Sequence, residues 1–479
     1  MVRSKGDGEI LDNCGNLRTA QPGHAESEMK YMHSLSGKKV AVVGLGLSGI
    51  AAARLLSQQK AVVSVTDDKT EKELEAERRS LRRIVKEYHL GGISERLLLD
   101  SDMIIISPGV PSDLPQLQEA RAAGIMIISE VELAYWFCDV PILAITGTNG
   151  KTTTTSLVHH LVTFAGLKAQ LGGNIQIPFS QVVNKKPSDA MVLEVSSFQL
   201  ENIRDFSPFV GILLNITPDH LNRYHSMDEY AAAKFALFKN QSAGDFAVLN
   251  QDDEFVAQSA ENICSKILWF SLNREVEQGA FLRGTRVVVR YEDREKEILD
   301  VSQIPLLGRH NVENVLAAVA AVLPLEIPWT NYARAVKNFK GVEHRLERVR
   351  EKDGVLFVND SKATNIDALV KALESFERPI ILIAGGRGKG SSYLVLRPLF
   401  EKKVRAMVTL GEDAPLLEEA LAGIVPITRA ATLPEAVSLA ATMAHPGDCV
   451  LLAPACASFD MFRNYEHRGR VFKETVNKL

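Results

Sequence analysis

One pattern recurs along this chain and restricts how it can fold. A short run of apolar residues ends in a glycine or polar loop, and a helical segment follows. "AVVGLGLSGIAAARLL", from Ala41 to Leu56, is the first clear example. Because such runs are apolar throughout, they are typical of parallel strands with helices on both faces. The pattern predicts an α/β protein, and 479 residues suffice for about three domains.

The apolar runs fall into three groups, which we expect to be three α/β domains behind an N-terminal tail. The tail mixes glycine, serine, asparagine and charged residues, and it lacks the continuous apolar core of a signal peptide. The expected parts are a poorly ordered tail at 1–35, a Rossmann-like domain at 36–129, a central P-loop-type ATPase domain at 130–341 and a C-terminal Rossmann-like domain at 342–479. Within the central domain, a β-rich segment is expected at 285–304 and a helix at 310–323.

Composition excludes several classes of partner. The formal net charge of −4 at pH 7 gives no basic field that would attract nucleic acid or an anionic membrane. No stretch of about 18 apolar residues predicts a transmembrane helix. The five cysteines are an odd number without metal-site spacing, which indicates reduced thiols. We therefore expect a cytoplasmic protein without nucleic acid or membrane partners. Its expected oligomeric state, which composition does not determine, is a monomer.

The first glycine loop has the spacing of a dinucleotide-binding fingerprint. Gly44, Gly46 and Gly49 form G-x-G-x-x-G, and Asp67 ends the next apolar run. A glycine turn at a helix N-terminus recognises a diphosphate but does not specify which nucleotide carries it. NAD and other nucleoside diphosphates both fit, and Asp67 suits a sugar hydroxyl or a uracil edge equally well.

A second loop, "AITGTNGKTTTT", has the parts of a Walker A phosphate loop. The strict G-x-x-x-x-G-K-[ST] pattern fails because position 145 is isoleucine, which leaves a shortened loop from Gly147 to Lys151. Backbone N–H groups and the helix N-terminus would still hold phosphate oxygens. Lys151 would neutralise phosphate charge and Thr152 would bind Mg²⁺. The alternative is an ordinary glycine–lysine helix entry.

Three further residues invite a chemical interpretation. Glu194 lies in the apolar strand "MVLEVSSF", where an unpaired charge is costly unless a metal or a cation lies beside it. His220 follows another strand and, taken alone, fits a structural hydrogen bond as well as a ligand. By its own context, Lys234 in "SMDEYAAAKFALF" is a solvent-exposed helix lysine, on a helix that Ser226 and Glu229 begin with a capping box.

Eight motifs in order complete the sequence evidence. They are "TGTNGKTTT", "LEVSSFQLE", "NITPDHLNRY", "YAAAKFALF", "GRHNVENVLAA", "HRLE", "NDSKATN" and "PACASFDMFRNYEHRG". Together they resemble the cytoplasmic Mur ligases of peptidoglycan synthesis, from about residue 37 to the C-terminus. "SSFQLE", "NDSKATN" and "PACAS" resemble the branch that adds D-glutamate, whereas "TGTNGKT" alone also fits folylpolyglutamate synthetases.

The resemblance implies ATP-dependent ligation of D-glutamate to UDP-N-acetylmuramoyl-L-alanine. The acceptor carboxylate attacks the γ-phosphate of ATP, and the amine then attacks the acyl phosphate to give amide, ADP and phosphate. The glycine loop would hold UDP rather than NAD. Two other functions stay open, another ATP-dependent amino-acid ligase such as a folylpolyglutamate synthetase, and a non-catalytic nucleotide-binding module.

The resemblance also assigns residues to the ATP side of the reaction. The implied catalytic residues are Lys151, Glu194, His220 and Lys234. The implied ligands of Mg²⁺, expected as two ions, are Thr152, Glu194, His220 and Lys234, with a CO₂-derived carbamate on Lys234. The implied ATP contacts are Gly147, Thr148, Asn149, Gly150, Lys151, Thr152, Thr153, His310, Asn311, Asn314, Arg345 and Asp360.

The resemblance also implies contacts for the UDP-substrate and for D-glutamate. The implied UDP-substrate contacts are Leu47, Ser48, Asp67, Ser107, Pro108, Gly109, Asn174, Ser196, Gln199 and Arg223. The implied D-glutamate contacts are Lys362, Thr364, Lys389, Ser458, Phe459 and Tyr465. Tyr465 stands where the family pattern has phenylalanine, and the loop "GGRGKGSS" is longer than usual.

Overall fold

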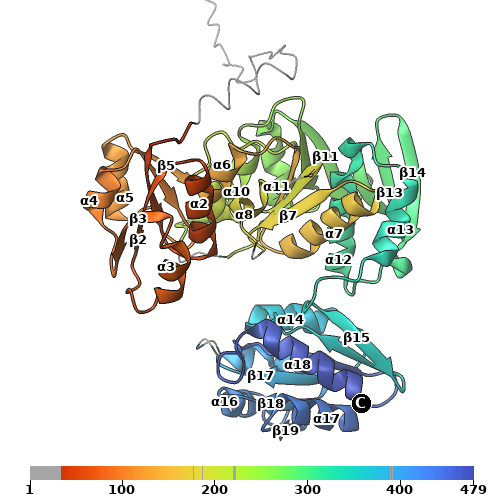
Figure 1. Ribbon diagram of the computed structural model, residues 1–479. Helices are drawn as coiled ribbons and strands as arrows, with labels where there is room; N and C mark the ends of the chain where they lie inside the picture. Colours follow the sequence, from red (N-terminus) through yellow and green to blue (C-terminus); the bar gives the residue numbers. More distant parts are fainter. Residues whose placement is uncertain (1–33, 176, 186, 220–222, 389, 391) are drawn as a thin grey trace, which may run out of the picture.

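The computed structural model describes residues 34–175, 177–185, 187–219, 223–388, 390 and 392–479. Three β-sheets organise the chain into three α/β domains, and the C-terminal domain lies below the other two in Figure 1. Residues 1–33 of the expected tail lie outside the described residues, whereas Leu35 is buried in the first core. The predicted fold class is confirmed.

The N-terminal domain contains a five-stranded parallel sheet with the order β3-β2-β1-β4-β5. This order reverses beside β1, and ligands of open α/β sheets bind at the carboxyl ends of the strands near such a reversal. The elements are β1 (Lys39–Val43), α2 (Leu47–Gln58), β2 (Val62–Asp67), α3 (Glu75–Leu81), β3 (Val85–Leu90), α4 (Glu95–Leu99), β4 (Met103–Ile106), α5 (Pro115–Ala122) and β5 (Met126–Ser129).

The central domain has a nine-stranded sheet with the order β14-β13-β12-β11-β10-β9-β6-β8-β7. The first half is α6 (Glu130–Tyr135), β6 (Ile142–Thr146), α7 (Lys151–Phe164), β7 (Ala169–Gly173), α8 (Phe179–Val182), β8 (Ala190–Glu194), α9 (Ser197–Leu200), β9 (Val210–Leu213), α10 (Met227–Phe235) and η1 (Ala236–Phe238). The second half is β10 (Phe246–Asn250), α11 (Glu254–Ser259), η2 (Ala260–Asn262), β11 (Lys266–Ser271), β12 (Gly279–Arg283), β13 (Arg286–Tyr291), β14 (Arg294–Asp300), η3 (Val301–Gln303), α12 (Arg309–Ala321), η4 (Leu323–Leu325) and α13 (Thr330–Asn338). The expected β-rich segment is the antiparallel β13–β14 pair.

The C-terminal domain has a six-stranded sheet with the order β15-β16-β20-β17-β18-β19, parallel except for β15. Its elements are β15 (Glu347–Lys352), β16 (Val355–Asn359), α14 (Ile366–Glu374), β17 (Ile380–Gly385), η5 (Tyr393–Leu396), α15 (Arg397–Lys403), β18 (Val404–Leu410), α16 (Ala414–Ala420), β19 (Ile427–Arg429), α17 (Leu433–Met443), β20 (Cys449–Leu452) and α18 (Tyr465–Lys478).

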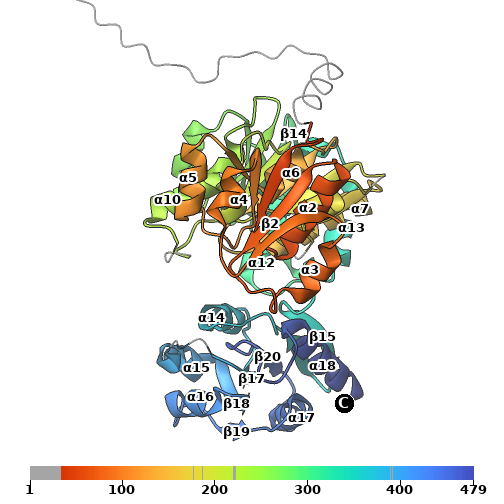
Figure 2. The same ribbon diagram turned by 60° about the vertical axis from the view of Figure 1, so that its left-hand side comes forward.

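The first two domains share one apolar core, whereas the C-terminal domain has cores of its own. The shared core joins α2 of the N-terminal domain to α6 and α8 of the central domain. Figure 2 shows the same arrangement from a second direction, with the C-terminal domain joined to the pair near α12 and β15. Burial of a common core therefore fixes the first glycine loop relative to the phosphate loop. In the part of the chain that the structure describes, no helix has the length and hydropathy needed to cross a membrane.

Candidate active site

The first glycine loop depends on two glycines and on Asp67. Gly44 has φ +89°, and a Cβ at Gly49 would lie 1.9 Å from the Gly44 oxygen. Asp67 Oδ2 accepts a hydrogen bond from the Leu45 N–H (2.6 Å), and Oδ1 accepts one from the Lys69 N–H (2.9 Å). The Asp67 carboxylate therefore braces the loop itself, and its predicted contact with a sugar or uracil stays a prediction.

The other predicted UDP-side residues lie at the carboxyl ends of strands in the first two domains. Ser107 Oγ donates to the Gly44 carbonyl (2.8 Å), which joins the loop after β4 to the glycine loop. Ser196 and Gln199 form a reciprocal capping box at the start of α9. The remaining residues of this group in the N-terminal domain are Leu47, Ser48, Pro108 and Gly109, of which Leu47 is 63% exposed.

The phosphate loop runs from β6 into α7 and requires its glycines. Gly147 and Gly150 have φ values of +149° and +83°, and a Cβ at Gly150 would lie 2.3 Å from Asn314 Oδ1. Lys151 Nζ donates to the carbonyls of Gly147 (2.8 Å) and Thr148 (2.9 Å), so its side chain folds back over the loop. Burial lowers the pKa of Lys151. Thr152 and Thr153 are half-buried in the first turn of α7, a position where backbone N–H groups can hold an anion.

Two neighbouring elements hold this loop in place. Asn215, after β9, accepts from the Asn149 N–H through Oδ1 (2.8 Å) and from the Thr148 N–H through its carbonyl (3.0 Å). On the other side, Thr154 Oγ1 donates to Asn314 Oδ1 (3.1 Å). Sequence reasoning missed Asn215 and Thr154, although both lie within the quoted motifs.

The predicted ATP contacts on α12 support the loop from behind. Asn314 Nδ2 donates to Asn311 Oδ1 (3.0 Å), and Asn311 Nδ2 donates to the Leu307 carbonyl (2.6 Å). His310 is exposed at the start of the same helix. The structure therefore places Asn311 and Asn314 beside the phosphate loop, and the contact of His310, Asn311 and Asn314 with ATP stays a prediction.

Glu194 has the character of a cation ligand. It lies at the end of β8, beside β6, and is 3% exposed. Its Oε1 accepts from Asn174 Nδ2 (2.9 Å), whereas its buried Oε2 has no partner among the described residues. A buried carboxylate oxygen without a partner costs free energy, so a cation at Oε2 would remove that cost. His220 lies outside the described residues, and within them no three His, Cys, Asp or Glu side chains form a metal cluster.

Lys234 corrects the prediction made from its own sequence context. It is 1% exposed rather than solvent-exposed. Its Nζ donates to the Gly147 carbonyl (2.9 Å) and lies 4.5 Å from the centre of the Tyr230 ring. The cause is the buried face of α10, which carries Tyr230 and Lys234 one helical turn apart. Burial, followed by the charge of Lys151, lowers the pKa of Lys234 to about 7.

Only half of the predicted capping box forms at the start of α10. Ser226 Oγ accepts from the Glu229 N–H (3.1 Å), as expected. The Glu229 carboxylate accepts from the His225 N–H (2.7 Å), one residue before the cap. The helix start is therefore confirmed, and the reciprocal bond was wrong by one residue.

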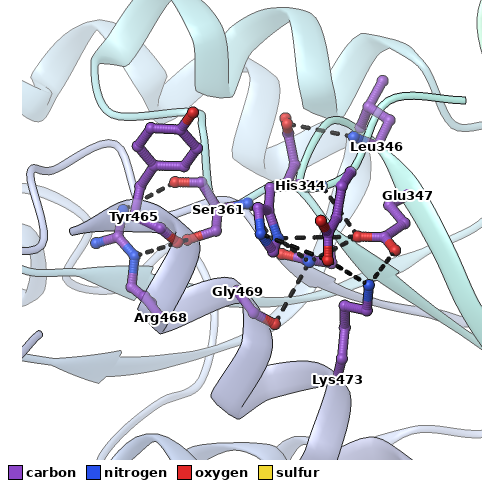
Figure 3. Close-up of polar contacts among 11 residues, drawn as sticks. His344, Leu346, Glu347, Ser361, Tyr465, Arg468, Gly469 and Lys473 are labelled. Atoms are coloured by element: carbon purple, nitrogen blue, oxygen red, sulfur yellow. Dashed lines mark hydrogen bonds and ion pairs between the residues drawn. The ribbon is translucent and has the colours of Figure 1, made fainter. Parts of the chain in front are cut away.

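Arg345 projects from a turn that the C-terminal domain holds tightly. His344 and Leu346, on either side of it, have φ values of +65° and +39°, which are costly for residues with a side chain. His344 donates its N–H to Glu347 (2.9 Å), and its ring nitrogen Nδ1 bonds the Asn359 amide (2.9 Å). Figure 3 shows this network between β15, β16 and α18. The turn leaves Arg345 exposed.

The turn also brings charge toward the phosphate loop. After burial and the charge of Glu194, the Arg345 guanidinium contributes to the pKa shift of Lys151. Asp360 is buried, accepts from the Leu346 N–H (3.3 Å), and burial raises its pKa to about 6. The charge of Arg345 therefore acts on the phosphate loop, and the contact of Arg345 and Asp360 with ATP stays a prediction.

A buried arginine joins the loops that carry the predicted D-glutamate contacts. Arg468 is 2% exposed and donates to the carbonyls of Ser361 (2.9 Å) and Cys456 (3.1 Å) and to Ser361 Oγ (3.0 Å), as Figure 3 shows in part. Lys362 Nζ lies 5.3 Å from the centre of the Tyr465 ring. Sequence reasoning missed Arg468 and Ser361. The other members of the set are Thr364, half-buried, Ser458, 2% exposed, and Phe459, 65% exposed, while Lys389 lies outside the described residues.

Three family models match the chain in succession. They are the Mur ligase MurD-like N-terminal domain at 38–129, the Mur ligase middle domain at 145–322 and the Mur ligase glutamate ligase domain at 344–456. Solved structures share the fold. The UDP-N-acetylmuramate-alanine ligase MurC of Thermotoga maritima has a TM-score of 0.56 at 20% identity, covering 92% of this chain and 99% of that one. A pseudomurein peptide ligase type C of Methanothermus fervidus has a TM-score of 0.55 at 18% identity, covering 92% and 100%.

Curated relatives are much closer in sequence. The UDP-N-acetylmuramoylalanine–D-glutamate ligase of Koribacter versatilis is 48% identical over 446 residues, which cover 92% of this chain and 98% of that protein. The Salinibacter ruber protein of the same name is 46% identical over 92% of this chain and 98% of its own length. With models that match all three domains and relatives of this similarity, the chain belongs to the Mur ligase family.

Proposed function

We propose that this protein is an ATP-dependent ligase that joins D-glutamate to UDP-N-acetylmuramoyl-L-alanine in cytoplasmic peptidoglycan precursor synthesis. One observation carries the proposal. A glycine phosphate loop, a buried glutamate with an unpartnered oxygen and a buried lysine meet at one edge of the central sheet. The names of the curated relatives support the choice of substrates.

The chain supplies the groups that phosphoryl transfer needs. The N-terminus of α7 and Lys151 bind the phosphates, since both present positive charge to the loop. Among the residues that the structure describes, Glu194 Oε2 and Thr152 Oγ1 are candidates to bind Mg²⁺. His220 is a further predicted ligand. Bound Mg²⁺ would neutralise charge that develops on the transferred phosphoryl group. The acceptor carboxylate can then attack the γ-phosphate, and the resulting acyl phosphate is open to the amine.

The proposal includes a carbamate on Lys234. Carbamylation requires a neutral amine, and the pKa of about 7 that burial gives Lys234 leaves much of it neutral at physiological pH. A carbamate converts a cation into an anionic oxygen donor. That change also removes the repulsion between Lys234 and the neighbouring Lys151.

The C-terminal domain would bind the incoming amino acid, D-glutamate. Lys362 and Lys389 would pair with the two carboxylates of D-glutamate, and Thr364 and Ser458 would donate hydroxyl hydrogen bonds. Arg345 would reach the phosphates from its strained turn when the C-terminal domain and the ATP loop meet. Asp360 contacts the backbone of the same turn.

The proposed setting is the cytoplasm, with a monomeric enzyme and no macromolecular partner. Cys449 and Cys456 are buried free thiols, which agrees with a reducing compartment. The net charge of −4 offers no general attraction for nucleic acid.

The decisive experiment measures phosphate release from ATP with UDP-N-acetylmuramoyl-L-alanine and a panel of D- and L-amino acids. We expect turnover with D-glutamate, little with L-glutamate, and no competition by NAD. A Lys151→Ala variant is the matched inactive control. Turnover with a folate acceptor and L-glutamate instead would move the protein to another branch of ligases, and no turnover with any amino acid would favour a non-catalytic module.

A further inference from the structure

Glu201 lies where the N-terminal and central domains meet, directly after α9. Its Oε2 accepts hydrogen bonds from Arg223 Nη2 (2.8 Å) and Ser112 Oγ (2.9 Å), and its Oε1 accepts one from Tyr224 OH (2.7 Å). Its side chain is only 14% exposed and that of Arg223 is 19% exposed. One carboxylate therefore binds two segments that are far from it in the sequence, Arg223–Tyr224 in the central domain and Ser112 in the N-terminal domain.

Through two of these partners, Glu201 reaches the predicted UDP-substrate loop. Arg223 donates to the carbonyls of Pro108 (3.3 Å) and Val110 (3.2 Å), just after β4. Its guanidinium lies 4.3 Å from the centre of the Phe198 ring, so it is held between the two domains. Ser112 belongs to the same loop as Pro108, which Ser107 joins to the glycine turn.

Through its third partner, Glu201 reaches the phosphate loop. The Tyr224 ring packs against Tyr230, with the ring centres 5.2 Å apart. Tyr230 OH lies 3.3 Å from Thr148 Oγ1, within hydrogen-bond distance, and its ring faces Lys234 Nζ at 4.5 Å. A continuous set of packed side chains therefore joins this carboxylate to the loop that binds ATP in the proposed function.

We propose that Glu201 is a positioning residue that fixes the UDP-substrate loop and the phosphate loop relative to each other. The assignment of a substrate to each loop rests on the proposed function. The acceptor carboxylate and the γ-phosphate must meet in line, and a misplacement of about 1 Å can cost about 100-fold in rate. A single ionic anchor shared by both loops is suited to preventing that misplacement, because it is short and largely shielded from water.

The test compares three substitutions that each remove a different part of the cluster. Ser112→Ala removes the bond of Glu201 to the N-terminal domain. Tyr224→Phe removes the Tyr224 hydroxyl, which bonds Glu201 and Ser197, and keeps the ring that packs on Tyr230. Glu201→Gln weakens the bonds to both Ser112 and Tyr224. The matched control is Glu418→Gln, which alters a Glu–Arg pair in the C-terminal domain between Glu418 and Arg429, far from both loops.

Steady-state kinetics, with calorimetric Kd values for UDP and ADP, separate the possible outcomes. We expect Glu201→Gln to lower kcat by about 10- to 100-fold and to raise the KM of both UDP-substrate and ATP. Ser112→Ala should raise only the UDP-substrate KM, and Tyr224→Phe should lower kcat and raise only the ATP KM. Glu418→Gln should change none of these quantities.

Two results would overturn the role of Glu201. One is a Glu201→Gln enzyme with unchanged kcat and unchanged KM values. The other is a loss of kcat that only follows the loss of folded protein, with the three variants alike in thermal midpoint and kinetics. If the wild-type enzyme does not use D-glutamate, the proposed function fails instead. The Kd values for UDP and ADP still test Glu201 in that case, because both should rise in Glu201→Gln.

Discussion

Replacing Lys234 with methionine should abolish activity while making the protein more stable at neutral pH. Burial shifts the pKa of Lys234 from 10.5 to about 7. At pH 7.5 the amine is therefore charged in the unfolded chain and mostly neutral in the folded one, so folding must release a proton. Each pH unit between 7.5 and 10.5 costs about 1.4 kcal/mol of folding free energy, or about 4 kcal/mol in total.

Methionine occupies a similar volume and avoids that cost. It loses the hydrogen bond from Nζ to the Gly147 carbonyl, which is worth about 1 kcal/mol. The net expectation is a gain of about 3 kcal/mol at pH 7.5. Because the folded pKa is depressed, the penalty on lysine is complete below pH 7 and disappears as the pH approaches 10.5. The gain for methionine should therefore shrink toward zero by about pH 9.5.

The assay is denaturant and thermal unfolding of wild type and Lys234→Met at pH 7.5 and 9.5 in CO₂-depleted buffer. Lys337→Met, at an exposed position on α13, is the control and should change the unfolding midpoint little. A Lys234→Met protein that is less stable than wild type at pH 7.5 would refute the reasoning about burial, because the cost of the buried amine would then be absent.

Activity and spectroscopy test the carbamate separately. Lys234→Met and Lys234→Arg should both lack turnover, since neither side chain can become an anionic ligand. Lys234→Ala should regain some turnover with a short-chain carboxylic acid that fills the vacated position. With ¹³C-labelled CO₂, wild type should show a carbamate carbon resonance that Lys234→Met lacks. Near-wild-type turnover of Lys234→Ala without added acid would contradict the carbamate.

Three further predictions concern other parts of the chain. Burial raises the pKa of Glu130 from 4.5 to about 7, so wild type should lose about 3 kcal/mol of stability relative to Glu130→Gln as the pH rises from about 4.5 to 7, measured by unfolding at several pH values; parallel profiles would contradict it. Gly150→Ala should raise the KM for ATP at least tenfold because its Cβ would meet Asn314, whereas Gly166→Ala, also at positive φ but in open space, should leave that KM unchanged. Arg345→Ala should lower kcat far more than it weakens calorimetric binding of the UDP-substrate, and equal losses would argue against action across the domain boundary.

Apolar runs in the sequence mark interior strands more clearly than they mark some of the strands at the sheet edges. Runs such as Met103–Ile106 and Ile380–Gly385 are buried along their whole length, so their apolar character is visible in the sequence. The strands Val85–Leu90 and Glu347–Lys352 show no such apolar run, because both lie at a sheet edge and expose much of their length. Edge strands tolerate charged residues, which removes the apolar pattern on which the prediction depends.

In the candidate site, too, a residue could be predicted only where its immediate sequence neighbours reveal its environment. Glu194 was predicted from the residues alone because a charge inside an apolar strand contrasts with its immediate neighbours. Lys234 was assigned wrongly on that basis because the residues that bury it, such as those around Gly147, come from a segment 87 positions away. Residue type and local periodicity describe the face a helix presents, but not what covers that face.

Glu201 shows why a positioning residue is harder to find than a ligand. Its partners Arg223 and Ser112 are 22 and 89 positions away, and no local pattern distinguishes this glutamate from an ordinary polar residue after a short helix. Its environment is created only when the N-terminal and central domains pack on their shared core. A catalytic or ligand residue such as Glu194 can be recognised in the sequence because its apolar neighbours make its charge costly. A residue that aligns two loops depends on contacts that exist only in the folded chain. A substitution of a positioning residue should therefore change kcat and the KM values of two substrates together. This combined effect distinguishes it from a substitution of a residue that binds one ligand.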